Sequence, residues 1–261
     1  MEHKNFNKNG DENQSEPAND IIYGRHPVLD ALEVGKQFEK IMMQVGTRGD
    51  FEKQVRNLCK IANIPLQVVP KEKLYTLTSN NHQGIIGVVS PIVYQNLEEI
   101  LPEILAIGQL PLFVLLDGIT DVRNVGAIAR SAELAGAHAL IVSKKNIAAI
   151  NADAMKTSAG ALNILPVCRV ASLQTAVEYL KRNNIPLLAA DMRGKTMLYD
   201  TAFKRPMAIV MGAEGRGVNY DLLKELDGTF RIPMVGQTDS YNVSVATGMV
   251  LYEIMRQRMQ S

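Results

Sequence analysis

Apolar residues between positions 21 and 259 recur in two spacings, and these spacings predict where strands and helices lie. Short runs rich in Val, Ile and Leu predict β-strands, whereas apolar residues three or four positions apart predict α-helices. In the first part of the chain the predicted strands cover 40–45, 66–69 and 85–89, and the predicted helices cover 27–32, 51–62 and 71–76. We therefore predict a small α/β domain over residues 20–92.

The second part of the chain alternates strand and helix more regularly. Predicted strands lie at 112–116, 139–142, 187–190, 208–210 and 230–232, and predicted helices at 125–135, 152–159, 173–182, 220–225 and 243–259. Such alternation predicts a mostly parallel sheet covered by helices on both faces. This second α/β domain is expected over residues 109–261, after a linker over 93–108 that contains a predicted helix at 97–107.

Composition narrows the class of protein. Residues 1–19 are rich in Asn, Lys, Glu and Gln and almost without apolar side chains, so we predict a disordered tail. No apolar run approaches the roughly 20 residues of a membrane helix, and the N-terminus lacks a signal-peptide core, so a cytoplasmic protein without a membrane partner is expected. The net charge of +1 does not by itself indicate a nucleic-acid binder, although residues 21–95 hold 9 basic and 6 acidic side chains.

Cysteine and histidine positions argue against a metal site. Cys59 and Cys168 lie far apart without the paired spacing of metal ligands or disulfides, so buried free thiols are expected. The four histidines do not share metal-ligand spacing, and no metal is expected; they are His3, His26, His82 and His138.

Three junctions, each just after a predicted strand, carry the densest polar and glycine content. They are residues 124–132, 211–217 and 231–248. In α/β sheets, ligands bind in the crevice beyond the carboxyl ends of the strands. We therefore expect the three junctions to form one site.

These segments resemble, in order and spacing, the three motifs of the SpoU-type RNA ribose 2′-O-methyltransferases of the SPOUT superfamily. The motif residues are Asn124-Val125-Gly126 with Arg130, then 211–215, then 232–234 with Ser240, Asn242 and Ser244. The resemblance covers residues 110–261. Through 23–28 and 82–85, the first domain resembles the small ribosomal-protein-like RNA-binding domain of many members. Within the family, the chain is most similar to members that methylate a guanosine ribose in bacterial 23S ribosomal RNA.

The resemblance implies properties that periodicity does not give. Family members tie the C-terminal sheet domain into a trefoil knot, bind S-adenosylmethionine in the knotted loops, and use the last helix to build a homodimer across which the RNA site is completed. Knots are rare in proteins, so only the resemblance supports one here. The alternatives are a transfer-RNA ribose methyltransferase or a non-catalytic RNA-binding ribosome-assembly protein on the same fold. A dinucleotide-dependent dehydrogenase is disfavoured because the glycine fingerprint is missing after an early strand.

The resemblance also assigns candidate catalytic residues: Arg130, Asn124, Glu214, Ser240 and Asn242. Arg130 is expected near the exposed N-terminal end of its helix. In this family the matching arginine is often assigned as the general base. A guanidinium is effectively never deprotonated in a protein, so we expect Arg130 to bind phosphate or to stabilise a developing alkoxide.

Each of the other polar candidates has a plain structural alternative. Asn124 either holds Arg130 or the ribose in place or caps its helix, and both can hold. Glu214 is expected to gather amides from neighbouring loops; a catalytic-base role is the less favoured alternative. Ser240 and Asn242 are expected to position the ribose and its phosphate, although Asn242 could serve only as a helix cap.

By analogy with the family, the cofactor contacts are Gly212, Ile232, Met234, Tyr241 and Asn242. Tyr241 departs from the usual leucine, which leaves a backbone contact intact but changes the pocket wall. The RNA contacts implied by the resemblance are Arg25, His26 and His82, together with Arg130. For the first three, ordinary solvated surface residues are the alternative.

Overall fold

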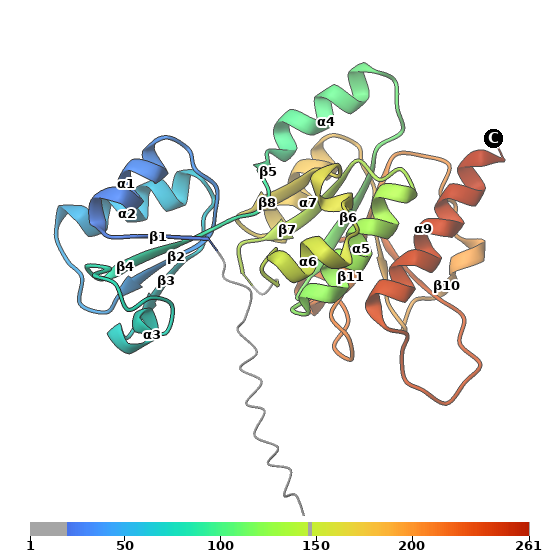
Figure 1. Ribbon diagram of the computed structural model, residues 1–261. Helices are drawn as coiled ribbons and strands as arrows, with labels where there is room; N and C mark the ends of the chain where they lie inside the picture. Colours follow the sequence, from blue (N-terminus) through green and yellow to red (C-terminus); the bar gives the residue numbers. More distant parts are fainter. Residues whose placement is uncertain (1–19, 146–147, 261) are drawn as a thin grey trace, which may run out of the picture.

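The computed structural model describes residues 20–145 and 148–260, which form two α/β domains side by side (Figure 1). The predicted tail over 1–19 lies outside the described residues. None of the described helices is long and apolar enough to cross a membrane. The elements of the N-terminal domain are β1 (Ile21–Tyr23), α1 (Arg25–Glu33), β2 (Phe38–Gln44), α2 (Asp50–Ile61), β3 (Leu66–Val69), α3 (Lys71–Tyr75) and β4 (Ile85–Val89).

The N-terminal domain is a four-stranded sheet in the order β1-β4-β2-β3, in which only β2 and β3 run parallel. Ile41 and Met42 of β2 face opposite sides of the sheet, and a register shift between Phe38 and Lys40 places Phe38 on the side of Ile41. Phe38 and Ile41 pack with residues of α1 and α2, whereas Met42 packs with Leu74 of α3 and Ile86 of β4. The domain therefore has a small core of its own on each face.

The C-terminal domain is an eight-stranded sheet in which every neighbouring pair is parallel, in the order β10-β12-β9-β11-β6-β7-β8-β5. This confirms the predicted parallel α/β architecture. Its elements are β5 (Tyr94–Gln95), α4 (Leu97–Ala106), β6 (Leu112–Asp117), α5 (Val122–Leu134), β7 (Ala139–Ser143), α6 (Ala152–Thr157), η1 (Ala161–Asn163), β8 (Val167–Val170), α7 (Leu173–Arg182), β9 (Leu187–Ala190), β10 (Thr196–Met197), η2 (Leu198–Asp200), β11 (Met207–Gly212), α8 (Tyr220–Glu225), β12 (Gly228–Arg231) and α9 (Val243–Met259).

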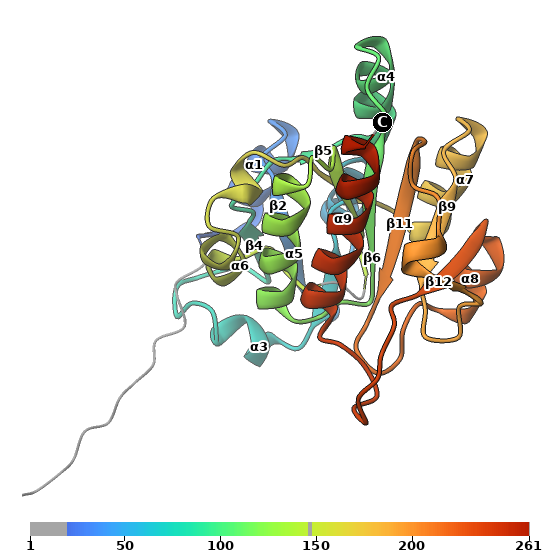
Figure 2. The same cartoon turned by 90° about the vertical axis from the view of Figure 1, so that its right-hand side faces the viewer.

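Helices cover both faces of this sheet (Figure 2). The alternation along β6 shows why: Leu112, Val114 and Leu116 enter a core formed with α5, α6 and α9. The intervening Phe113 and Leu115 enter a second core formed with α4, α7 and α8. Because both faces are buried, β6 reads in the sequence as a continuous apolar run.

Two expectations differ from the structure. The residues expected to be a linker belong to the C-terminal domain: β5 pairs with β8, and α4 buries Leu97, Ile100 and Leu101 in the second core. The strands β1, β5, β8 and β10 were not predicted, and β1 has only three residues. β5 and β10 have only two residues each, and Arg169 interrupts the apolar pattern of β8.

The neighbouring strands β6 and β11 mark the place where the connections diverge. Both strands end at the same level, with Asp117 paired to Gly212. From β6 the chain passes through α5 on one face, and from β11 it passes through α8 on the other. Such a divergence opens a crevice beyond the strand ends. The trefoil knot implied by the resemblance stays a prediction.

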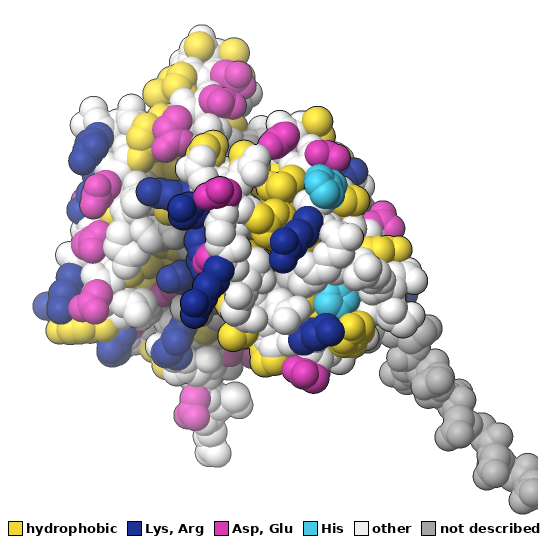
Figure 3. Space-filling view, turned by 90° about the vertical axis from the view of Figure 1, so that its left-hand side faces the viewer, with side chains coloured by type: hydrophobic (Ala, Val, Ile, Leu, Met, Phe, Trp, Pro, Cys, Tyr) yellow, Lys and Arg dark blue, Asp and Glu magenta, His cyan; other side chains and the backbone are white. Residues whose placement is uncertain are grey.

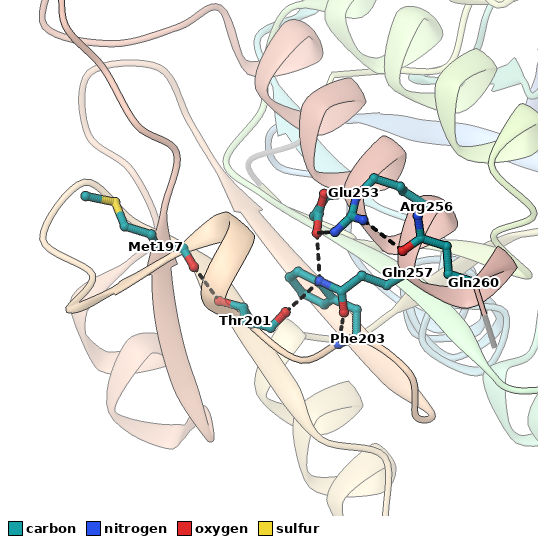
Figure 4. A network of polar contacts seen from close by, with 7 residues as sticks. All are labelled: Met197, Thr201, Phe203, Glu253, Arg256, Gln257 and Gln260. Carbon is teal, nitrogen blue, oxygen red and sulfur yellow. Dashed lines mark hydrogen bonds and ion pairs between the residues drawn. The ribbon is translucent and has the colours of Figure 1, made fainter.

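The second half of α9 is fixed to the segment 197–203 by a polar network (Figure 4). The Gln257 amide donates to the Thr201 carbonyl (2.9 Å) and to Glu253 Oε1 (2.7 Å), and its oxygen accepts from the Phe203 amide (2.9 Å). Arg256 also donates to Glu253, which lowers the pKa of that carboxyl. One glutamine side chain thereby satisfies two backbone groups of an irregular segment.

We expect Gln257→Ala to lower the free energy of unfolding of the C-terminal domain by about 1–3 kcal/mol, because two backbone groups lose their partners. Urea unfolding followed by circular dichroism measures the change. Gln260→Ala is the matched control, since its side chain bonds only the Arg256 guanidinium, and we expect it to change stability by less than about 0.5 kcal/mol. Equal stability of Gln257→Ala and the wild type would contradict the anchoring role.

Candidate functional site

One carboxylate oxygen joins the three junctions that the sequence analysis grouped into one site. Oε1 of Glu214, in the turn after β11, accepts from Asn124 Nδ2 (3.2 Å), Asn242 Nδ2 (2.6 Å) and the Val243 amide (3.1 Å). Asn124 comes from the first turn of α5, and Asn242 and Val243 come from the start of α9. The structure thus brings together three of the five candidate catalytic residues.

Asn242 serves two purposes at once. Its Oδ1 accepts from the Ser244 amide (3.0 Å) and the Val245 amide (3.4 Å), so it caps α9. Its Nδ2 meanwhile donates to Glu214 and to Asn124 Oδ1 (3.1 Å). The structural alternative considered for Asn124 is wrong, because the N-cap of α5 is Asp121, whose carboxylate accepts from the Arg123 amide.

The turn that carries Glu214 depends on glycine. Residues 213–217 form a tight turn in which the Gly217 amide donates to the Ala213 carbonyl (2.7 Å). A Cβ on Gly212 would collide with the backbone of Gly217 and Val218. Position 212 therefore has room for no side chain, and the two strands of the turn lie backbone to backbone.

A pocket of about 330 Å³ lies beyond the carboxyl ends of β9, β11 and β12. Four of the five expected cofactor contacts line it: Gly212, Ile232, Met234 and Tyr241. Ser240 and Glu214 also line it, whereas Asn242, Asn124 and Arg130 do not. Tyr241 donates its hydroxyl to the Pro233 carbonyl (3.2 Å), which ties together the two ends of the loop over residues 233–241.

The sequence analysis missed an ion pair in the pocket wall. Asp191 directly follows β9, and its side chain is 6% exposed. Arg193 donates Nε to Oδ1 and Nη2 to Oδ2 of Asp191, each at 2.9 Å, and this lowers the pKa of the Asp191 carboxyl. The signal was available, because Asp191 stands at the end of a predicted strand like the other junctions.

Arg130 lies elsewhere than expected. It is the ninth of the 13 residues of α5, so it is not near the N-terminal end of the helix. Six residues separate it from Asn124, which is about 9 Å along the axis and about 240° around it. Arg130 is exposed and forms no hydrogen bond or ion pair with the described residues. Glu214, Asn124, Asn242 and the Val243 amide form the Glu214 cluster, and within one chain the structure does not bring Arg130 to it.

The expected RNA contacts of the N-terminal domain divide into two kinds. Arg25 and His26 are exposed at the start of α1, and the Arg25 guanidinium lies 4.9 Å from the centre of the Phe51 ring. His82 is only 3% exposed, and its Nδ1 accepts from the Gly84 amide (3.0 Å), so its ring is part of the domain interior. On this side of the molecule, Lys and Arg side chains are spread among Asp and Glu (Figure 3).

Comparison with known proteins identifies the family. The model of the SpoU rRNA Methylase family matches residues 111–252, more than half of the chain. The chain belongs to the SpoU rRNA methylase family. A second family model, described as RNA 2′-O ribose methyltransferase substrate binding, matches residues 21–95. The chain is therefore a SpoU-family RNA 2′-O-methyltransferase with an N-terminal substrate-binding domain, and its cofactor is S-adenosylmethionine.

Similar proteins extend over nearly the whole chain. The 23S rRNA (guanosine-2′-O-)-methyltransferase RlmB of Photorhabdus laumondii is 37% identical over 241 residues, which cover 92% of this chain and 98% of that protein. An uncharacterized tRNA/rRNA methyltransferase of Synechocystis is 35% identical over 250 residues, which cover 95% of this chain but 65% of that longer protein. The crystal structure of the SpoU methyltransferase AviRb from Streptomyces viridochromogenes in complex with AdoMet has a TM-score of 0.60 and 26% identity, and the match covers 92% of this chain and 91% of that one.

The pocket of this SpoU methyltransferase fits its cofactor. Its volume falls in the range of about 300–1,000 Å³ that is typical of small-molecule sites. Its wall combines apolar side chains such as Ile232 and Met234 with Gly212, whose backbone lies against that of Gly217 and Val218. No group of three or more His, Cys, Asp or Glu suited to hold a metal ion occurs among residues 20–145 and 148–260.

We expect Glu214→Ala to lower kcat at least about tenfold, because the amides of Asn124, Asn242 and Val243 lose their common acceptor. A hydrogen bond to a charged group contributes about 1.5–3 kcal/mol, and about 1.4 kcal/mol corresponds to tenfold in rate. Glu214→Gln keeps an acceptor oxygen and is expected to stay within about threefold of the wild type, less than about 1 kcal/mol. Single-turnover methyl transfer measures both.

Glu103→Ala, an exposed glutamate on α4, is the matched control and should leave the rate unchanged. A Glu214→Gln variant as inactive as Glu214→Ala would contradict the structural role and point to a carboxylate that acts as a base.

Proposed function

We propose that this enzyme methylates the 2′-hydroxyl of a guanosine in 23S ribosomal RNA. The relative described as a 23S rRNA guanosine methyltransferase supports this substrate, because the similarity spans both domains and nearly the full length of each chain. The observation that carries the proposed site is the Glu214 cluster at the rim of the pocket. It joins the start of α5, the turn after β11 and the start of α9 through one carboxylate oxygen.

We propose that one group of residues binds the cofactor and a second group orients the ribose. Gly212, Ile232, Met234 and Tyr241 would hold S-adenosylmethionine, which supplies a methyl group on a sulfonium that is already an excellent leaving group. The task left to the protein is to align the ribose hydroxyl and to deal with its proton. Ser240, which is half-buried in the pocket wall, and Asn242, two positions further along the chain, would orient the ribose.

Arg130 would act through its charge. A guanidinium can bind the phosphate next to the target ribose or stabilise a developing alkoxide, but it is effectively never deprotonated. Because Arg130 lies about two turns after Asn124 on α5 and forms no bond to the Glu214 cluster among the described residues, we propose that it completes the site of a second subunit.

A homodimer through α9 fits the exposed apolar side chains. Val245, Tyr252 and Met259 are 49%, 61% and 78% exposed and lie seven positions apart, so they form one stripe along the helix. Leu134, at the end of the neighbouring α5, is 71% exposed. Contiguous exposed apolar surface of this kind marks an interaction site, and a twofold interface would bring α5 of one subunit toward the site of the other.

The substrate is tested by transfer of labelled methyl to unmodified 23S rRNA, followed by alkaline hydrolysis. Alkali cuts RNA through the 2′-hydroxyl, so we expect the label in an alkali-stable dinucleotide whose first base is guanine. Label in single nucleotides would mean base methylation and would contradict the reaction. Transfer to tRNA alone would favour a transfer-RNA substrate, which the Synechocystis relative described as a tRNA/rRNA methyltransferase keeps open.

The shared site is tested by mixing two variants that are each expected to lose most of the activity, Arg130→Ala and Glu214→Ala. If Arg130 acts in the partner's site, one of the two sites in each mixed dimer contains both native residues. Random reassociation makes about half of the dimers mixed, so activity should return to about a quarter of the wild type. No recovery, with mixed dimers present by mass spectrometry, would contradict a site built from two subunits.

Arg130→Lys is the control for the charge itself. It should retain part of the activity at neutral pH and lose it as pH rises toward about 10.4, the ordinary pKa of lysine, whereas the wild-type rate should not fall in that window. A lysine variant inactive at all pH values that still binds RNA would show that the planar guanidinium, and not charge alone, is required.

A further inference from the structure

The two domains have separate hydrophobic cores, so their mutual orientation depends on the junction between them. Every buried residue of the N-terminal cores lies between 28 and 86, and every buried residue of the C-terminal cores lies between 92 and 254. No apolar core among the described residues spans the two. At the junction the structure instead places a buried cluster of polar side chains: Glu39, Tyr94 and Arg169.

Arg169 reaches from the C-terminal sheet to strand β2 of the N-terminal domain. It lies on β8, and its side chain is 3% exposed. Nη2 donates to the Phe38 carbonyl (2.8 Å) and Nη1 to the Glu39 carbonyl (3.4 Å). The guanidinium also stacks 3.7 Å from the centre of the Tyr94 ring. Both carbonyls belong to β2, so this one side chain holds the N-terminal domain by its backbone.

Glu39 reaches in the opposite direction. Its Oε1 accepts from the Ile150 amide of the C-terminal domain (3.1 Å), and its Oε2 accepts from the Tyr94 hydroxyl (2.6 Å). Nη1 of Arg169 lies 3.9 Å from the same Oε2. The bond from Ile150 to Glu39 spans 111 positions and the bonds from Arg169 to β2 span 130 and 131, so the cluster joins distant segments from both sides of the junction.

Burial of these charges is costly, which argues against an incidental contact. Desolvation raises the pKa of Glu39 and lowers the pKa of Arg169. Nε of Arg169 is buried and has no hydrogen-bond partner. A buried ion pair contributes little net stability compared with apolar packing, but it accepts only a narrow range of geometries. The Arg169–Glu39 pair therefore restricts the angle between the two domains more than it stabilises the fold.

We propose that Arg169 is a positioning residue that locks the substrate-binding domain at one angle to the methyltransferase domain. The inference rests on the proposed function. RNA held by the N-terminal domain meets the pocket at a high effective concentration only while the two surfaces keep a fixed relation. Release of the lock would leave each domain folded and the cofactor pocket intact, but it would separate RNA capture from methyl transfer.

The test compares full-length wild type, Arg169→Met and Tyr94→Phe. Arg169→Met keeps an unbranched apolar chain but loses the bonds to β2. Tyr94→Phe keeps the stacked ring and loses the hydroxyl that donates to Glu39. Arg182→Met is the matched control, since Arg182 forms an exposed ion pair with Glu178 on α7. Small-angle X-ray scattering measures the separation of the domains. Hydrogen exchange compares the rate at the Ile150 amide, which donates to Glu39 across the junction, with the rate at the Leu140 amide, which donates to the Pro166 carbonyl within its own domain.

For Arg169→Met we expect a larger radius of gyration and at least about tenfold faster exchange at Ile150, with Leu140 unchanged. The KM for whichever RNA the wild type methylates, 23S transcript or tRNA, should rise about tenfold, while kcat and the Kd for S-adenosylmethionine stay within about twofold. Tyr94→Phe should show the same pattern at about a third of the size. Arg182→Met should match the wild type.

Unchanged scattering and unchanged Ile150 exchange in both variants would overturn the lock. A loss of cofactor affinity equal to the loss of RNA affinity would also overturn it, because it would indicate that Arg169 supports the fold of the C-terminal domain. Scattering and exchange need no methyl transfer. A failure of the proposed substrate is therefore distinguishable from a failure of the lock.

Discussion

The site depends on the hydrogen bonds that one oxygen atom, Oε1 of Glu214, accepts from two distant parts of the chain. Asn124 is 90 positions before Glu214 and Asn242 is 28 positions after it, and nothing local in the sequence would hold either one there. The oxygen also accepts the Val243 amide, one of the groups that a helix start leaves unsatisfied. The start of α5, the turn after β11 and the start of α9 therefore cannot move independently without leaving donors unpaired.

The rest of the domain supports this arrangement from a distance. The far half of α9 is bound through Gln257 to the irregular segment after β10, so both halves of the helix are fixed. The parallel sheet brings the ends of β6 and β11 to one level, and their helices leave on opposite faces. At Gly212 the absence of a side chain lets two backbones approach closely, which forms one wall of the pocket.

A carboxylate with several donors recurs at the junction of the domains, where Glu39 joins Tyr94, Ile150 and Arg169. The two clusters differ in exposure: Glu214 lies at the rim of an open pocket, whereas Glu39 is 8% exposed. In both places hydrogen bonds to a carboxylate hold separate segments together. Hydrogen bonds depend on distance and angle more strictly than apolar contacts do, so they fix the relative position of the segments more specifically. The proposed lock and the proposed two-subunit site would together set where an RNA chain can lie.

The sequence by itself determined the α/β class, the two domains, most helices and long strands, and the family, because these follow from apolar spacing and from ordered motifs. It also grouped the three junctions, since the carboxyl ends of parallel strands meet at one edge. Only the tertiary structure decided the rest. The two-residue strand β5 is too short for periodicity and forms by pairing with a strand over 70 positions away. His82 carries a polar side chain that looked exposed but is enclosed by its own domain. Arg130 lies in the third turn of its helix because the helix begins three residues earlier than expected. Arg169, an apparent interruption of an apolar strand, became a buried contact because a second domain covers it, and no local pattern encodes what a distant segment will cover.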